Sequence, residues 1–203
     1  MSARGKFQTV GLLGPLELLV IAILLSGCAT TVPLKPTVDH LPSVSKIPLS
    51  VGIYYSPELR SYKYEVAQPG NSCLGTPVLV GQLSVSLFER LFLMMFHSTV
   101  TLESRQTLLS TKANLSLVIE PDIEDIKCDA FPKSYTVKIT YHFTLYSPNG
   151  ELLAHWNVTG WGHPKRGFDS RKTAELAMQD AADRIAIQFR EIPAVKRLLQ
   201  EKR

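Results

Sequence analysis

The clearest pattern in the chain is a strict alternation of apolar and polar residues from position 135 to 145, in the segment YTVKITYHFTL. Odd positions are apolar and even positions are polar without exception. A strand with this alternation has one face on a core and the other on water or on a partner. The segment therefore predicts a half-buried strand, and Ser147-Pro148-Asn149-Gly150 predicts a turn directly after it.

A return strand follows, with its apolar face at even positions. These positions are Leu152, Ala154, Trp156 and Val158. Pro-Asn-Gly favours a three-residue loop with a glycine bulge, whereas matching the two apolar faces requires odd residues to oppose even ones. We follow the apolar pattern, because a slip by one residue would bury His155 and Asn157.

Two segments repeat apolar residues at the spacing of an amphipathic helix. The first spans residues 78–96, with Thr76 as its N-cap and Pro77 at its first position. Its apolar stripe comprises Val80, Leu83, Leu87, Leu91 and Met94 or Met95. The second begins near Asp169 or Ser170, either of which can cap it. Its apolar stripe comprises Ala174, Ala177, Met178, Ala181, Ile185 and Phe189.

Four shorter segments complete the predicted sheet. They are residues 51–55, 62–66, 99–102 and 114–119. The acidic residues 120–125 lack the glycine and regular oxygen ligands of a calcium loop, so we interpret them as a solvated edge at which Pro121 stops ladder growth. The element order predicts an α+β fold, a mainly antiparallel sheet with two helices packed on one face, in a single domain over residues 50–203.

The N-terminal region has the composition of an export signal. Arg4 and Lys6 precede an apolar run over residues 18–25, which is too short to span a bilayer but has the length of a signal-peptide core. The run ends in Leu25-Ser26-Gly27-Cys28, a motif that resembles the lipobox of bacterial lipoprotein precursors. The resemblance implies that residues 1–27 are a signal peptide and that the Cys28 thiol receives diacylglycerol, with palmitate or a similar chain added after cleavage.

The resemblance also implies where the protein is placed. Ala29, directly after the lipidated cysteine, permits sorting onward, which predicts an outer-membrane lipoprotein of a Gram-negative bacterium with its domain in the periplasm. Residues 28–49 carry four prolines without sustained periodicity and predict an extended tether. The alternative is an ordinary cysteine behind an apolar segment that Glu17 shortens.

The charge of the chain is mildly basic. The net charge of +4 falls to +3 when residues 1–27 are removed, because Arg4, Lys6 and Glu17 are lost with them. This balance tolerates anionic headgroups nearby but is far below that of a nucleic-acid-binding domain. We therefore expect no nucleic-acid partner.

Two cysteines remain after lipidation, Cys73 and Cys128. In an oxidising periplasm such a pair predicts a disulfide, which would stabilise the fold by roughly 4 kcal/mol through loop-closure entropy. Free buried thiols are the alternative. A metal site is less favoured, because neither cysteine has a second cysteine or histidine at ligand spacing.

Four residues are candidates for contact with a partner: His142, His155, Phe92 and Phe96. If Ser147 faces Gly150, His142 lies opposite His155, and two such imidazoles could sense acid or share a metal. No third ligand is identifiable, so we favour two solvated histidines and no metal site. Helix 78–96 has more apolar surface towards its end than one sheet face needs, which makes a partner or lipid contact an alternative to core packing there.

No catalytic motif is present, neither a Gly-x-Ser-x-Gly elbow nor a Ser-x-x-Lys, phosphate-loop or dinucleotide pattern. We therefore assign no catalytic residue and no cofactor. The element order alone resembles that of envelope-assembly and transport-auxiliary lipoproteins.

We expect a non-enzymatic binding or adaptor domain that acts on another envelope protein, with membrane lipid as the second partner through acylated Cys28. The alternatives are a lipid-anchored enzyme acting on cell wall or glycan, and a carrier of an apolar ligand held between helix 78–96 and the sheet. The pattern leaves the oligomeric state and the identity of the partner open.

Overall fold

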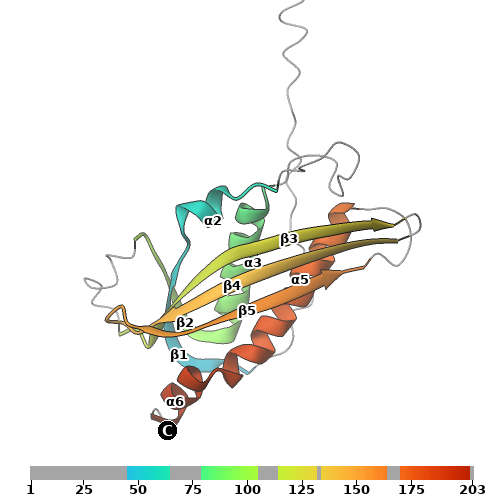
Figure 1. The fold of residues 1–203 in the computed structure, drawn as a ribbon. Helices are drawn as coiled ribbons and strands as arrows, with labels where there is room; N and C mark the ends of the chain where they lie inside the picture. Colours follow the sequence, from blue (N-terminus) through green and yellow to red (C-terminus); the bar gives the residue numbers. More distant parts are fainter. Residues whose placement is uncertain (1–44, 65–78, 105–113, 132–133, 164–169, 202–203) are drawn as a thin grey trace, which may run out of the picture. The chain divides into compact units, whose positions relative to one another are not determined.

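The computed structural model describes residues 45–64, 79–104, 114–131, 134–163 and 170–201 (Figure 1). All of them belong to one unit, Leu34–Arg203, and the other unit, Met1–Pro33, lies outside the described residues. The elements in chain order are β1 (Ile47–Tyr54), α2 (Pro57–Ser61), α3 (Val80–Met95), β2 (Phe96–Leu102), β3 (Leu117–Phe131), β4 (Ser134–Tyr146), β5 (Leu152–Gly162), α5 (Ser170–Gln188), a 3-10 turn η1 (Phe189–Glu191) and α6 (Pro193–Glu201).

The five strands form one sheet in the order β2-β1-β3-β4-β5. The α+β class is confirmed, but the prediction of a mainly antiparallel sheet is wrong, because β1 runs parallel to both β2 and β3. The reason is the crossover through α3, which returns the chain to the starting side of β1 before β2 begins. Only the β3–β4 and β4–β5 pairs are antiparallel.

The structure has more helices than the two predicted. Residues 57–61 form the short helix α2 where the sequence suggested only the end of a strand, because the Ser56 hydroxyl caps it by accepting a hydrogen bond from Leu59 N–H at 3.0 Å. After Pro193 the chain forms α6, whose Val195 is fully buried. The described part of the chain therefore has four α-helices.

The first strand begins earlier than predicted, at Ile47, and so includes residues that the tether prediction covered. Ile47 and Leu49 are fully buried, which is why they join the sheet rather than the tether. The Arg190 guanidinium of η1 donates to the backbone carbonyl of Ser45 and also to its hydroxyl. The start of β1 is thus held against the C-terminal helices.

Strand β3 continues through the acidic residues that the sequence analysis placed after its end. Its pairing with β1 stops at Ile119, two residues before Pro121, on the side of β3 that faces β1. The prediction that Pro121 ends ladder growth is correct for this side only, since β4 pairs with β3 along its whole length.

The turn between β4 and β5 is the three-residue loop that Pro-Asn-Gly favours, although the sequence analysis gave preference to the apolar pattern. Gly150 N–H donates to the Ser147 carbonyl at 2.9 Å, and Ser147 N–H donates to the Glu151 carbonyl at 2.8 Å. Gly150 has a φ of +85°, a left-handed conformation that favours glycine.

A β-bulge at Leu153 then shifts the register by one residue, between the pairs Tyr146↔Leu152 and Leu145↔Ala154. Beyond the bulge, odd residues oppose even ones, as the apolar pattern predicts. Turn chemistry and apolar pattern are therefore both correct. Leu152, predicted to lie on the apolar face, is instead 59% exposed, and Leu153 packs against the core in its place.

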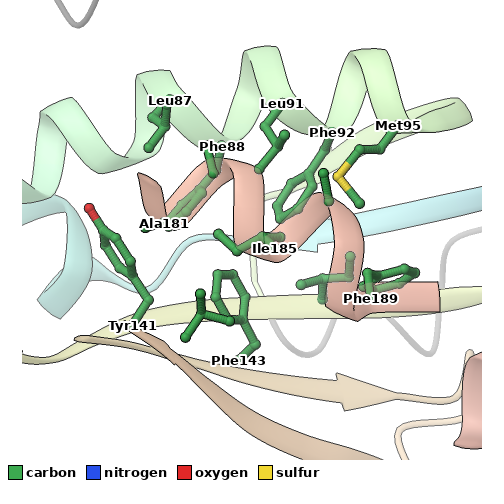
Figure 2. Close-up of a cluster of buried hydrophobic side chains, with 14 of the residues drawn as sticks. Leu87, Phe88, Leu91, Phe92, Met95, Tyr141, Phe143, Ala181, Ile185 and Phe189 are labelled. Atoms are coloured by element: carbon green, nitrogen blue, oxygen red, sulfur yellow. The ribbon is translucent and has the colours of Figure 1, made fainter. Parts of the chain in front are cut away.

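The core lies between β4 and the two long helices (Figure 2). The Phe88 ring meets Tyr141 and Phe143 edge to face, with centroids 5.0 and 5.4 Å apart. The Tyr141 hydroxyl lies 3.0 Å from the Ser84 hydroxyl, and burial raises the pKa of Tyr141 well above its usual range. This layer of rings fills the space between α3 and the sheet.

Phe92 and Phe96 belong to this core and not to a partner surface. Each side chain is 1% exposed, because Phe92 packs on Phe88 and Phe96 packs on Phe189 of η1. Neither ring is therefore accessible to another molecule.

The backbones of helix α5 and strand β5 lie in direct contact. The predicted stripe of α5 is buried throughout, and two glycines of β5 face it. A Cβ atom on Gly160 would lie 2.0 Å from the carbonyl oxygen of Ala177, and one on Gly162 would lie 1.9 Å from that of Thr173. Only glycine allows this approach.

We expect Gly160→Ala to lower the free energy of unfolding by about 1–3 kcal/mol, because the added methyl group must push α5 away from the sheet. Urea unfolding followed by circular dichroism measures the loss. Thr144→Ala on the other face of the sheet serves as the control, and equal stability of the two variants would contradict the packing argument.

Candidate functional site

The three antiparallel strands expose one face of the sheet, which we call the open face. The residues at odd positions of β4 point into the core, where α3 and α5 cover them, so the residues at even positions lie on the open face. Figure 1 shows β3, β4 and β5 in front of the two long helices, with this face towards the viewer. On β5 the open-face residues are His155, Asn157, Thr159 and Trp161.

A chain of hydrogen bonds crosses all three strands on the open face. Asn157 of β5 lies opposite His142 of β4, and its side-chain oxygen is 2.6 Å from His142 Nδ1. The Asn157 amide nitrogen donates to Glu124 Oε2 of β3 at 2.5 Å. A glutamate and a histidine from different strands are thus fixed by one asparagine.

Glu124 reaches this position because of a second β-bulge. The register of β3 against β4 shifts between Ile123 and Asp125, so Glu124 has no direct partner in the ladder. Glu124 and Asn157 were not predicted as site residues from the sequence. A signal exists, however, since Ile123 and Ile126 both face the core although they are three positions apart, and a regular strand would bring them to opposite faces.

The hydrogen-bond chain determines the tautomer of His142. Because the Asn157 nitrogen donates to a carboxylate, its oxygen must be the atom that faces His142, and an oxygen can only accept. His142 Nδ1 therefore carries the proton. In the neutral ring this leaves the lone pair on Nε2, which can accept a hydrogen bond from a donor on another molecule.

His142 and His155 are neighbours but are not directly opposite, so the predicted pairing is wrong. The bulge at Leu153 moves His155 opposite Thr144 instead. The two rings are diagonal neighbours, with centroids 6.0 Å apart and planes at 32°. The described residues contain no group of three metal-ligating side chains, so the pair has no third ligand among them.

The far end of the open face carries an aromatic and basic group. The Lys138 ammonium lies 5.4 Å from the centroid of the exposed Trp161 ring, and Thr136 Oγ1 lies 3.2 Å from His163 Nδ1. On β3, Lys127 forms an ion pair with Asp125 at 3.0 Å, and this hydrogen bond raises the pKa of Lys127. The open face is thus polar and of mixed charge along its length.

Several predicted site residues lie outside the described residues, including Cys28, Cys73 and the apolar run. The predicted helix start at Thr76-Pro77 is wrong, because α3 begins at Val80 with Leu79 as its N-cap. Cys128 lies in β3, half-buried, with its side chain packed against the core. Its disulfide with Cys73 stays a prediction. Among the helices that the structure describes, none combines the length and the apolar character needed to cross a bilayer.

No protein-family model matches the chain, and none of the curated proteins matches it either. Solved structures do resemble it, all with low sequence identity. One is a protein from Xanthomonas campestris, with 10% identity, coverage of 85% of this chain and 94% of that one, and a TM-score of 0.47. A minor lipoprotein from Acinetobacter baumannii has 7% identity, coverage of 73% and 94%, and a TM-score of 0.36.

A third similar structure is a lipoprotein from Neisseria meningitidis. It has 8% identity, coverage of 59% of this chain and 87% of that one, and a TM-score of 0.34. At these scores we draw nothing from the three structures for this chain.

We expect the ring nitrogens of neutral His142 to show the Nδ1–H tautomer in ¹⁵N NMR spectra, because Asn157 accepts from that nitrogen. Asn157→Ala should remove this preference, since the Nδ1 proton loses its acceptor. His155 in the same spectra is the internal control. An unchanged His142 tautomer in the variant would contradict the assigned hydrogen-bond chain.

Proposed function

We propose that the protein is a lipid-anchored outer-membrane lipoprotein whose periplasmic domain binds another envelope protein through the open face of β3, β4 and β5. The domain would act as a non-enzymatic binding or adaptor module in an envelope assembly or transport complex. The observation that carries the proposal is the hydrogen-bond chain from Glu124 through Asn157 to His142, which is exposed on the open face.

The anchor half of the proposal rests on the sequence around Cys28. A short apolar run, two small residues and a cysteine match what lipoprotein export requires. Strand β1 begins at Ile47, and a fully extended segment from Cys28 to this strand would span roughly 60 Å, at about 3.3 Å per residue. Such reach suits a domain that must find a partner away from its own membrane.

The proposal that the open face binds a partner rests on the fixed geometry of its side chains. Holding an exposed side chain in one geometry costs conformational entropy. A sheet face that meets only water has no function that requires this cost. Here three side chains from three strands are held by hydrogen bonds of 2.5 and 2.6 Å. Donors and acceptors in fixed positions lower the entropy cost of binding, so this face favours recognition of a polar protein surface.

The two alternatives have less support. A carrier of an apolar ligand needs space between α3 and the sheet, and Phe88, Tyr141 and Phe143 fill that space with ring contacts (Figure 2). A cell-wall enzyme needs a nucleophile or an acid–base pair in direct reach of each other, and here the Asn157 amide, which transfers no proton, stands between the His142 imidazole and the Glu124 carboxylate.

Cys28→Ala should release the protein from the membrane while leaving the domain folded, because the acyl chains provide the hydrophobic anchor at about 0.8 kcal/mol per buried methylene. Fractionation of cells after a salt wash, with circular dichroism of the released domain, measures both effects. If the variant still sediments with the outer membrane as the unmodified chain does, the apolar segment itself must hold the protein.

A photo-crosslinking residue in place of His155 should capture one discrete envelope protein, because this position lies on the open face beside His142. Glu124→Ala should weaken the capture, since Asn157 then loses its acceptor. The matched control carries the crosslinker at Ser86, which is exposed on α3. The same products from both positions would contradict a specific site, and peptidoglycan turnover by the purified full-length protein would favour the enzyme.

A further inference from the structure

The two edges of the sheet are built differently. Strand β5 forms one edge, and its Trp161 N–H donates to the Asp180 carboxylate of α5 at 2.9 Å. Arg184 donates to the same carboxylate oxygen at 2.9 Å and so holds it in place. The backbone N–H of Trp161 on the β5 edge is therefore satisfied by a side chain of the same domain.

Strand β2 forms the other edge and lacks this protection. In the described part of the chain it has a ladder partner on one side only, β1. From Ser50↔Ser98 to Tyr54↔Leu102 the register is regular, without a bulge. The strand reads FHSTVTL, so it contains no proline, lysine, arginine, aspartate or glutamate. These are the residues with which natural edge strands prevent further pairing.

The side chains of β2 are also accessible. His97, Ser98, Val100 and Thr101 are exposed, and Val100 is 41% exposed although it is apolar. Leu93 and Met94 are exposed on the last turn of α3, which continues into β2 without a loop. Threonine and valine have high β propensity, so this segment is suited to accept another strand.

We propose that β2 pairs with β2 of a second copy of this chain, in antiparallel orientation about a twofold axis at Thr99. The two five-stranded sheets would then form one continuous sheet of ten strands. This inference goes beyond the proposed function, since it concerns the edge opposite to β5 and not the open face.

The sequence of β2 allows a second copy of this chain to serve as the added strand. A twofold axis at Thr99 brings His97 opposite Thr101 and Ser98 opposite Val100, and no acidic or basic pair arises from any of these contacts. Self-pairing of a charged edge would place like charges together, which destabilises a strand pair. An uncharged seven-residue strand therefore meets its own copy without repulsion in a twofold interface, in which every contact occurs twice.

The test uses full-length protein in its own membranes, with single substitutions Ser98→Cys, Thr99→Cys and Val100→Cys. Mild oxidation should give a disulfide-linked dimer most efficiently for Thr99→Cys, because on the axis each residue meets its own copy. There are two matched controls. One is the unsubstituted chain, which keeps its native cysteines, and the other is Ser86→Cys, at an exposed position of α3. Non-reducing electrophoresis measures the dimer fraction.

Adding Val100→Lys to Thr99→Cys should remove most of the dimer, because each copy then brings a lysine to the shared edge while the exposed position leaves the fold intact. The proposal is overturned if none of the three cysteine variants exceeds the Ser86→Cys control. A crosslink from β2 to a different protein would overturn the second-copy assignment. Capture of a partner at position 155 is scored separately, so failure of one proposal leaves the other measurable.

Discussion

The contact between the backbones of α5 and β5 is the constraint on which the rest of the domain depends. Gly160 and Gly162 have no Cβ, so the helix lies almost on the strand, and Ala177 and Ala181 keep its own side small. With α5 this close, Phe189 at its end reaches both Trp156 and Phe96, at centroid distances of 5.9 and 5.0 Å. One aromatic core thereby joins α3, α5, the β4–β5 hairpin and the start of β2. Both long helices occupy the same face of the sheet.

Two β-bulges determine which side chains meet on the open face. The bulge at Leu153 reconciles the loop with the apolar pattern and moves His155 away from His142. The bulge beside Ile123 turns Glu124 towards Asn157. Each inserts one residue, and each changes which side chains meet across the strands while the buried pattern stays the same. The open face is therefore shaped independently of the core.

Most of the core could be predicted from the sequence, because buried positions recur with the spacing of a strand or a helix. The odd positions of β4 from Val137 to Leu145 and the stripe of α5 are buried as predicted, since one apolar face must meet the core. In α3, Leu83 of the predicted stripe is only half-buried, and Ser84 and Phe88 beside it are buried. Parallel pairing of β1 could not be found in this way, because the direction of a neighbouring strand leaves no trace in the alternation. The site was missed for a similar reason. Glu124 and Asn157 are ordinary exposed residues until the register of two strand pairs is known.

The place of β1 in the sheet has a mechanical consequence. The chain that leads from the N-terminus enters at Ile47, and β1 has parallel neighbours on both sides, β2 and β3. A pulling force applied through that chain would act along β1, so its ladder hydrogen bonds on both sides would share the load instead of opening one at a time. Arg190, bound to Ser45 just ahead of the strand, would pass part of the force to the C-terminal helices. A domain connected in this way resists being peeled apart from its N-terminal end.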